Sequence, residues 1–430
     1  MIGNETNLSK LNNASTVGDC QVCIGCGRCG RIHQDMHVLV NFLPLSDSTP
    51  EKQPERVGGT GEKKYALAVD LGTTTIAMCL TDDRGRELGS YCQPNPQYPW
   101  GADVLSRIQA AQDPGQCRQM QQCVWHVLQE GFEVLQKQIP ERNASVTIGL
   151  AGNTTMLYLL QGYVTGELGR APFRVSHPEI VCAQLCGYPM YGFPPLSAFV
   201  GGDILAGIWS SGMWQSEKPV LLMDLGTNGE IALGNRDRIL TCATAAGPAF
   251  EGGPCQGIWG ADMVSLTGEL LKRGLVDETG LLVDPYFEQG IQIGGVRITQ
   301  GAIRALQLAK GAIRAGVELL LDAYGCKASE VEQVLLAGGM GYYMQPAGAA
   351  QIGLLPKELA EKAVAAGNTA LGGAARAALA IGNQGLEPVV NQWKRIQQSV
   401  QTINLATHSD FEPLYLGFLD FPCLKLTKVD

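Results

Sequence analysis

Short apolar runs that end in turns of Gly and Thr recur along the chain from Tyr65 onward. Residues 65–80 (YALAVDLGTTTIAMCL) consist of an apolar run, the turn Asp-Leu-Gly-Thr and a second apolar run, a pattern that predicts a β-hairpin. The same order recurs at residues 220–234 (VLLMDLGTNGEIALG), with Asp224 in the place of Asp70. A repeat of this size predicts two similarly folded α/β lobes that face each other.

Helical periodicity is strongest between residues 298 and 325. Apolar residues recur there at three- and four-residue steps, and Gly325 supplies a stop, so we expect a helix packed on the second lobe. Strand–turn signals occur at 146–156 and 331–341. Residues 357–382 are rich in Ala and predict a helix pair broken at 367–369. We expect the last forty residues to form a short strand or helix that docks on the body of the protein.

These patterns divide the chain into four parts. Residues 1–40 form a Cys-rich module and residues 41–64, which contain Pro and Gly among charges, a flexible linker. Residues 65–215 form the first lobe and residues 216–430 the second, with a C-terminal docking segment. As a coil, the linker spans roughly 25–30 Å, so we expect the Cys-rich module to move relative to the lobes.

Composition excludes several classes of protein. The 430 residues include 32 Lys and Arg against 41 Asp and Glu, a net charge of −9, and no basic tract favours a nucleic-acid partner. No stretch of eighteen apolar residues occurs and the N-terminus lacks an apolar signal core, so we expect a cytoplasmic protein without a membrane partner. The 54 glycines gather in short clusters, which favours loops close to a ligand.

Four of the 14 cysteines stand within ten residues, at Cys20, Cys23, Cys26 and Cys29. The other ten are scattered through apolar runs, and we expect them to be small buried hydrophobic residues. Closely spaced thiolates separated by glycines favour a soft metal, and the first three cysteines fit the start of a bacterial [4Fe–4S] run. The fourth comes one residue early and is followed by Gly30 instead of Pro. We therefore predict an iron–sulfur cluster of [4Fe–4S] type, with a structural zinc site or no metal as alternatives. A further ligand from another chain or from His33 stays open.

The two hairpins have the chemistry of phosphate-binding turns. A Gly turn lets backbone N–H groups approach a phosphate, Thr hydroxyls add donors, and an Asp at the strand end holds a hydrated Mg²⁺. Two such turns on facing lobes would bind the triphosphate of Mg-ATP from both sides. The alternative is that both are ordinary β-hairpins whose turns bind no ligand. The expected contacts are Asp70, Gly72, Thr73, Thr74, Thr75, Asp224, Gly226, Thr227 and Asn228.

A third Gly-rich motif follows the strand expected near residue 335. Gly338, Gly339 and Gly341 allow the backbone to approach an adenine or ribose, although their spacing is not that of a dinucleotide fold and no capped helix is expected after them. The small residues at 367–373 predict either a hinge between the lobes or a tightly packed helix pair.

Hydrolysis of a nucleotide requires a carboxylate that orients the attacking water. We expect Asp203, after Gly201 and Gly202, to be this residue, with Asp70 and Asp224 beside it; an N-cap role for Asp203 is the alternative. Glu251 is the second candidate. Lys310 lies in the predicted long helix, where it reaches the nucleotide or belongs to a solvated face.

This ordered set of motifs resembles the actin and sugar-kinase superfamily, whose fold has two ribonuclease H-like lobes. Within it, the chain is similar over residues 65–425 to the reductive activators of corrinoid proteins. The motifs that carry this resemblance are 96–98 with 101–108, 151–156, 201–204, 247–253 and 310–313.

The resemblance implies an ATPase that transfers an electron from an iron–sulfur cluster to the Co(II) corrinoid of a methyltransferase system and so restores Co(I). It implies a corrinoid protein as partner, an unidentified electron donor and a possible homodimer. The chain departs from the family in its cluster motif, because those proteins carry a plant-type [2Fe–2S] domain or ferredoxin-like modules. Nucleotide binding would act on electron transfer through closure of the lobes, hinged near 367–373.

Three other functions stay open at this stage. The same nucleotide clamp serves a small-metabolite kinase, with Asp203 as the base for a substrate hydroxyl, although the cysteine run argues against it. A related activator that delivers an electron to another iron–sulfur enzyme, such as a dehydratase or a double-cluster reductase, is the second. A non-enzymatic scaffold is the third. We expect no tightly held corrinoid on this chain, because it lacks an Asp-x-His-x-x-Gly run.

Overall fold

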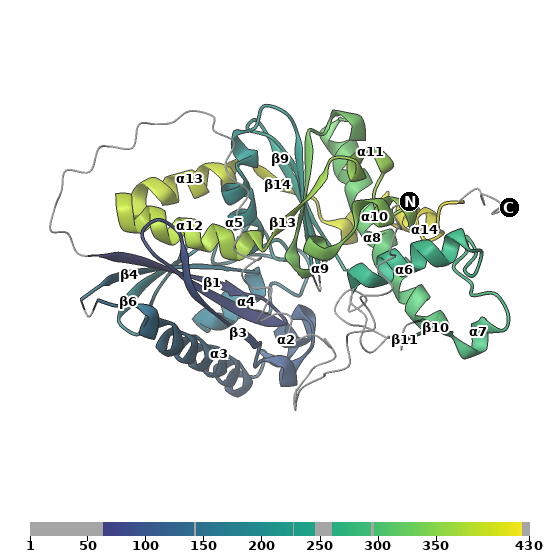
Figure 1. Ribbon diagram of the computed structural model, residues 1–430. Coiled ribbons are helices and arrows are strands. Elements are labelled where there is room, and N and C mark those ends of the chain that lie inside the picture. The colour runs from purple at the N-terminus through teal and green to yellow at the C-terminus, as the bar shows by residue number, and fades with distance from the viewer. Residues whose placement is uncertain (1–62, 142, 227, 246–259, 294–295, 424–430) are drawn as a thin grey trace, which may run out of the picture.

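The computed structural model describes residues 63–141, 143–226, 228–245, 260–293 and 296–423 (Figure 1). The described chain forms two lobes, each built on a six-stranded sheet of mixed direction. Among the described residues, no helix is both long and apolar enough to cross a bilayer.

The first sheet has the order β3-β2-β1-β4-β6-β5. The predicted hairpin is its centre: β1 and β2 pair in antiparallel fashion, and β4 pairs with β1 in parallel. Its strands are β1 (Lys64–Leu71), β2 (Thr75–Thr81), β3 (Glu87–Pro94), β4 (Ser145–Gly152), β5 (Val181–Leu185) and β6 (Tyr188–Gly192).

The second sheet has the order β13-β12-β7-β8-β9-β14. Read from β9, the run β9-β8-β7-β12-β13 repeats the run β3-β2-β1-β4-β6 of the first sheet, so the sequence repeat is a structural repeat. Its strands are β7 (Val220–Leu225), β8 (Gly229–Gly234), β9 (Ile239–Thr244), β12 (Gln333–Ala337), β13 (Ala363–Gly367) and β14 (Val400–Thr402).

Helices cover both faces of each sheet. The outer face of the first sheet packs against α3 (Pro114–Leu135), and the outer face of the second packs against α8 (Gln300–Tyr324). The inner faces pack against α5 (Gly202–Ser211) and α12 (Thr369–Gln384), which contact each other between the lobes (Figure 1). The second half of the chain therefore supplies α12, the helix that covers β1 and β4 of the first sheet.

The contact between the lobes depends on small residues. A Cβ on Gly149 of β4 would collide with the carbonyl oxygen of Ala374, and a Cβ on Gly373 would lie 2.6 Å from the carbonyl oxygen of Ala206. Only glycine allows these backbones to approach so closely. Of the two predictions for residues 367–373, this geometry matches the tightly packed helix pair, which consists of α12 and α5; use of these residues as a hinge stays a prediction.

The remaining elements connect and edge this framework. A two-stranded sheet pairs β10 with β11. These elements are η2 (Tyr98–Trp100), α2 (Val104–Ala110), η3 (Gln136–Gln138), α4 (Thr154–Gln161), η4 (Met213–Gln215), α6 (Gly260–Lys272), α7 (Tyr286–Gln289), β10 (Ile291–Ile293), β11 (Val296–Ile298), η6 (Ala328–Glu330), α9 (Gly338–Tyr343), α10 (Pro346–Gln351), α11 (Lys357–Ala360), α13 (Leu386–Ser399), η7 (Leu405–Thr407) and α14 (Phe411–Gly417).

Several sequence predictions are confirmed. Both hairpins form, and the long helix α8 ends at Gly325, whose φ of 75° is left-handed. The C-terminal segment docks on the body, because α14 packs on α8 and β14 adds to the second sheet.

One prediction is wrong. Residues 357–382 are not a helix pair, since the short α11 and the strand β13 precede α12. The glycines after β12 open a short helix, α9, which lacks a side-chain cap as expected, because its N-cap Ala337 offers no side-chain oxygen.

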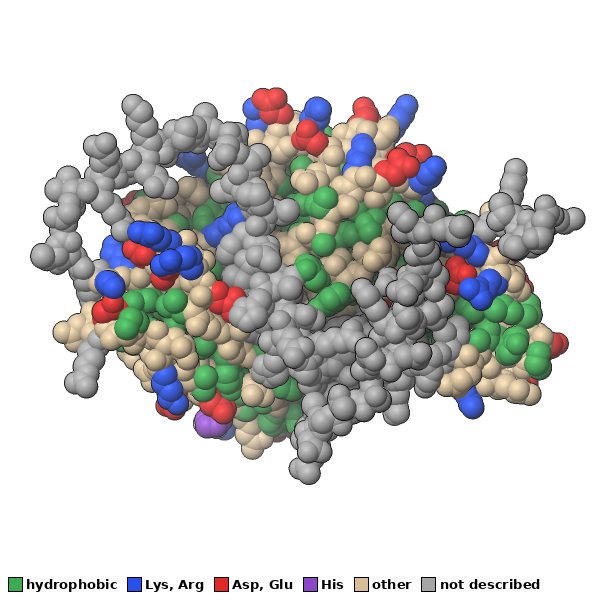
Figure 2. All heavy atoms as spheres, in the orientation of Figure 1, with side chains coloured by type: hydrophobic (Ala, Val, Ile, Leu, Met, Phe, Trp, Pro, Cys, Tyr) green, Lys and Arg blue, Asp and Glu red, His purple; other side chains and the backbone are tan. Residues whose placement is uncertain are grey.

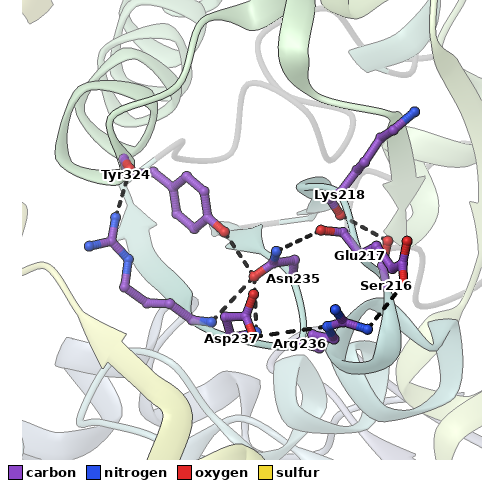
Figure 3. Close-up of polar contacts among 8 residues, drawn as sticks. Ser216, Glu217, Lys218, Asn235, Arg236, Asp237 and Tyr324 are labelled. Carbon is purple, nitrogen blue, oxygen red and sulfur yellow. Dashed lines mark hydrogen bonds and ion pairs between the residues drawn. The ribbon is translucent and has the colours of Figure 1, made fainter.

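A polar network holds the chain where it enters the second lobe (Figure 3). Asn235, in the turn after β8, donates from Nδ2 to the carbonyl oxygen of Glu217 at 2.8 Å and accepts at Oδ1 from the hydroxyl of Tyr324 at 3.0 Å. Arg238 donates to the carbonyl oxygen of Tyr324 at 2.8 Å and lies over its ring. The network therefore joins the entry to β7 with the C-terminal end of α8.

Figure 2 shows positive and negative side chains interspersed along the upper edge of one face. Exposed ion pairs such as Arg236–Glu217 and Lys218–Glu332 contribute little stability each. Within the described part of this face, the alternating signs form no basic track for a polyanion.

Candidate functional site

The two hairpin aspartates, Asp70 and Asp224, lie on the inner faces of the two sheets, which face each other. Along β7, Leu221, Met223 and Leu225 pack in the outer core, whereas Leu222 joins the core shared by both sheets. Because side chains alternate along a strand, Asp224 shares the inner face with Leu222.

The same alternation holds in β1. Leu67, Val69 and Leu71 pack outward, and Ala68 packs in the shared core. Asp70 therefore lies on the inner face, next to Ala68. The strand period brings both aspartates to the region between the lobes.

Four carboxylates act on one another there. Asp70 and Asp203 contribute from the first lobe, Asp224 and Glu230 from the second. Burial raises the pKa of Asp70 to about 6, although a hydrogen bond from Asn368 opposes the shift. Burial, and then the charge of Asp70, raises the pKa of Asp203 to about 7.

The second lobe shows the same effect more strongly. Burial, followed by the charges of Asp203 and Asp70, raises the pKa of Asp224 to about 8. Burial and the same aspartates raise the pKa of Glu230 well above its ordinary range. A group of acids that hold their protons this tightly needs positive charge if all are to be ionised.

Hydrogen bonds from two asparagine side chains hold the first hairpin turn in place. The Gly72 N–H donates to the carbonyl oxygen of Thr75 at 3.0 Å. Asn153, the N-cap of α4, donates from Nδ2 to Oγ1 of Thr73 at 2.9 Å. Asn95 donates from Nδ2 to the carbonyl oxygen of Gly72 at 2.8 Å. The turn is therefore held in place before any ligand binds.

The second turn lies against the glycine motif. The Gly226 N–H donates to the carbonyl oxygen of Asn228 at 3.0 Å. A Cβ on Gly338 would collide with Oδ1 of Asp224 and lie 2.8 Å from the carbonyl oxygen of Leu225, and Gly338 has a φ of 76°. Only glycine fits here, so the start of α9 and the end of β7 form one surface.

Gly339 and Gly341 occupy different surroundings. A Cβ on Gly339 would have no neighbour within 4 Å, whereas one on Gly341 would lie 3.0 Å from the backbone of Leu336. Gly339 therefore has open space beside its Cα, while Gly341 allows α9 to pack closely on β12. Contact of these glycines with an adenosine stays a prediction.

Asp203 lies in the first turn of α5, after the N-cap Gly201. Its Oδ1 accepts from the N–H of Ile204 at 2.8 Å. Gly201 packs against the backbone of Asn153 and Thr154, which fixes the start of α5 beside the first turn. The N-cap alternative for Asp203 is wrong, because the N-cap of α5 is Gly201 and Asp203 is the second residue of the helix. Its role in hydrolysis stays a prediction.

Lys310 is almost fully buried, with 1% of its surface exposed. Its Nζ donates to the carbonyl oxygens of Phe418 at 2.7 Å and Asp420 at 2.5 Å and lies 5.0 Å from the centre of the Phe421 ring. The solvated-face alternative is wrong. A contact with nucleotide stays a prediction, and it would require Lys310 to release these carbonyls.

Some predicted residues lie outside the described part of the chain, namely Cys20, Cys23, Cys26, Cys29, Thr227 and Glu251. Among the scattered cysteines, Cys79, Cys92 and Cys242 are buried as expected. The expectation is wrong for Cys182, Cys186 and Cys423, which are exposed.

The chemistry of the carboxylates suits a hydrated cation better than a bare one. Within the described residues, no group of three or more His, Cys, Asp or Glu side chains is arranged to hold a metal directly. Mg²⁺ keeps several of its waters and binds through one or two carboxylates plus substrate phosphates. The residues present therefore fit a magnesium ion that arrives with its nucleotide.

Sequence reasoning missed two residues of this site. Glu230 follows the second turn, and only the strand register shows that it lies opposite Asp224. Asn368 lies far from Asp70 in sequence, yet its Nδ2 donates to Oδ2 of Asp70 at 2.7 Å. The start of the Ala-rich helix after Asn368 was the available signal, since Asn caps helices.

Two family models match the chain. The model described as the RACo middle region matches residues 65–216. The model described as the C-terminal domain of RACo, the ASKHA domain, matches residues 218–257 and 253–430. Together they span both lobes.

Relatives agree with these matches. The corrinoid activation enzyme RamQ of Eubacterium limosum is 28% identical over an alignment 393 positions long, which covers 76% of this chain and 65% of that enzyme. A reductase for the Co(II) methylated amine-specific corrinoid protein of Methanosarcina barkeri is 26% identical, over 53% of this chain and 51% of that enzyme. The chain thus spans less than two thirds of either relative.

A solved structure is also similar. It is that of a reductive activator for a corrinoid, iron–sulfur protein, with a TM-score of 0.74 and 26% sequence identity. The match covers 85% of this chain and 67% of that protein.

Proposed function

The chain belongs to the RACo family, and from this premise we propose that it is an ATP-dependent reductive activator of a corrinoid protein. In this reaction one electron passes from the activator to the Co(II) corrinoid of a methyltransferase system, which becomes Co(I), while ATP is hydrolysed to ADP and phosphate. The relatives named for corrinoid activation and corrinoid reduction support the assignment.

The observation that carries the proposal is the pair of facing hairpins. In each, the first strand carries an aspartate near its end on the inner face of the sheet, and a glycine turn follows. A Cβ on Gly226 would have no neighbour within 4 Å, so the second turn has open space beside it, whereas the first turn is closed by the Thr75 carbonyl oxygen. Backbone N–H groups and hydroxyls of the turns would bind the phosphates, and Mg²⁺, when bound, would neutralise their charge.

Asp203 supplies the carboxylate for hydrolysis in this proposal. It lies in the first turn of α5, a helix that contacts α12 between the lobes. Positioning of the water and electrostatic stabilisation of the phosphates are the main contributions of such a site. Because its pKa is raised to about 7, the Asp203 carboxylate can accept a proton from the attacking water near neutral pH.

The electron would come from the Cys-rich module. Cys20, Cys23, Cys26 and Cys29 would ligate an iron–sulfur cluster of [4Fe–4S] type, which stores one electron when bound. The linker of residues 41–64 would give this module its reach. The cytoplasmic location, the external electron donor and a homodimer belong to the same proposal.

ATP affects the electron transfer only if it binds two conformations with different affinity. The lobes meet where α5 packs on α12, and a Cβ on Gly373 would lie 2.6 Å from the carbonyl oxygen of Ala206. We therefore assign the change to rigid-body closure of one lobe on the other.

Metal content and EPR spectra of protein purified without oxygen test the proposal first. Iron with acid-labile sulfide and a reducible signal is the expected result, followed by ATP-dependent conversion of Co(II) to Co(I) in an added corrinoid protein. Zinc or no metal would contradict the electron-transfer role, and kinase assays on small metabolites would then follow. A reducible cluster without any corrinoid reduction would favour another iron–sulfur enzyme as acceptor.

A further inference from the structure

The two hairpins differ in the residue opposite the aspartate. In the second sheet Asp224 of β7 pairs with Glu230 of β8 in the antiparallel register. Residues directly opposite in such a ladder point to the same face, with Cβ atoms about 4.5–5.5 Å apart. Glu230 is on the inner face with Ala232, which packs in the shared core, and 7% of its surface is exposed.

The first hairpin has no second carboxylate. Asp70 pairs with Ala77, and Asn368 supplies a hydrogen bond to its Oδ2 at 2.7 Å. Asp70 is thus satisfied by a neutral donor. Within the described part of the chain, no donor is hydrogen-bonded to Asp224, and no Lys or Arg forms an ion pair with Asp224 or Glu230.

Like charges directly opposite each other destabilise a sheet. A buried pair of carboxylates with no described cation is therefore costly unless an ion or a proton compensates it. Of the two hairpins, only the second has a carboxylate directly opposite its aspartate, so only the second has this additional requirement.

We propose that Glu230 is a positioning residue for the divalent cation, which it holds on the second hairpin through Asp224. The inference rests on the proposed nucleotide site and names the side of that site that binds the ion. Asp224 contacts the cation or one of its waters, while Glu230 adds negative charge and fixes the carboxylate of Asp224 from the neighbouring strand. The first hairpin then serves the phosphates through Thr73 and its backbone.

Mn²⁺ binding in the presence of ADP tests this assignment without any turnover. Room-temperature EPR of free Mn²⁺ gives the dissociation constant for the full-length protein with its cysteine thiols kept reduced. Glu230→Gln is expected to weaken Mn²⁺ binding by about tenfold or more, as loss of an outer-shell partner does. Asp70→Asn is expected to weaken it less, and Glu217→Gln, a change at an 80% exposed side chain, is the matched control.

Thermal melting in a chelator separates this role from a structural one. Because Glu230→Gln removes a like charge beside Asp224, its melting temperature should equal or exceed that of the unaltered protein, while its Mn²⁺ affinity falls. Unchanged Mn²⁺ affinity in Glu230→Gln would overturn the inference and leave the proposed function intact. Failure of the unaltered protein to bind Mn²⁺ with ADP would overturn the nucleotide site itself, and the inference with it.

Discussion

Asn368 joins the first strand to a helix of the second half of the chain: its Nδ2 donates to Oδ2 of Asp70, while its Oδ1 accepts from the N–H of Leu371 and caps α12. One side chain thus ties the first strand of the first sheet to the helix that covers that sheet. The Asn368 amide serves both contacts because it carries a donor and an acceptor at once.

Replacement of Asn368 tests that double role. Asn368→Ala removes the cap and the hydrogen bond to Asp70, and we expect a loss of about 1–2 kcal/mol of unfolding free energy. Asn368→Asp keeps the cap but places a carboxylate against Asp70, so it should be less destabilising at pH 5 than at pH 8. Denaturant unfolding at the two pH values measures both effects, and equal losses for both variants at both values would contradict the assignment.

The acid cluster predicts a pH dependence of stability. The folded-state pKa values of Asp70, Asp203 and Asp224, about 6, 7 and 8, lie above the ordinary value near 3.8. Between pH 4 and 8 the folded protein therefore binds more protons than the unfolded chain, and stability falls as the pH rises through this window.

Asp224→Asn should remove part of this fall. In chelator, we expect the difference in melting temperature between pH 6 and pH 8.5 to be smaller in Asp224→Asn than in the unaltered protein. Asp237→Asn, a change at a 77% exposed side chain, is the control and should leave the fall unchanged. If Asp224→Asn melts with the same pH dependence as the unaltered protein, burial does not raise the pKa of Asp224 as described.

Two neighbouring glycines offer a matched pair. Gly338→Ala places a methyl group against Oδ1 of Asp224 at a left-handed φ, which costs about 1–2 kcal/mol before any collision is counted. Gly339→Ala meets open space in a helix and should be neutral or slightly stabilising. We expect Gly338→Ala alone to lose binding of a fluorescent ATP analogue, measured by anisotropy; equal binding by both variants would argue against nucleotide contact near α9.

Lys310 predicts how firmly the C-terminal segment is held. Lys310→Met leaves the carbonyl oxygens of Phe418 and Asp420 without their donor, a loss of about 1–3 kcal/mol. Limited proteolysis followed by mass spectrometry should then show faster cleavage between residues 404 and 423. Lys357→Met, at a side chain that is 83% exposed, should cleave at the original rate.

The cysteine run predicts a separable redox module. Cys23→Ala should lose the iron chromophore and electron transfer to the corrinoid, because it removes one thiolate ligand. ATP binding, measured by calorimetry under nitrogen, should be retained. Loss of ATP binding together with the chromophore would mean that the module and the nucleotide lobes do not act as separate parts.

The repeat and the helical periodicity were sufficient to predict both hairpins and α8. They failed for β13, since its Ala-rich sequence has low strand propensity and forms a strand because β12 offers an edge to pair with. They also failed for α9, because its N-cap Ala337 carries no capping oxygen. In both places tertiary contacts outweigh local preference.

The sequence predicted only those residues of the candidate site that belong to a local motif. Asp70, Asp224 and the turns follow from the repeat, since each aspartate precedes its own glycine. Glu230 depends on the register across a turn, and Asn368 on a helix that returns from the second half of the chain. Such relations between distant positions need coordinates.

The placement of α12 also affects how the protein is made. The strand β1 leaves the ribosome early in translation, whereas the helix α12, which covers its inner face, begins only at Thr369. Translation of the intervening chain takes about 15–60 s at roughly 5–20 residues per second. For that time α5 alone can cover the apolar inner face of the nascent first sheet, and the part that α12 covers stays exposed, so early chaperone contact is expected at Ala68, Ala77 and Ala151.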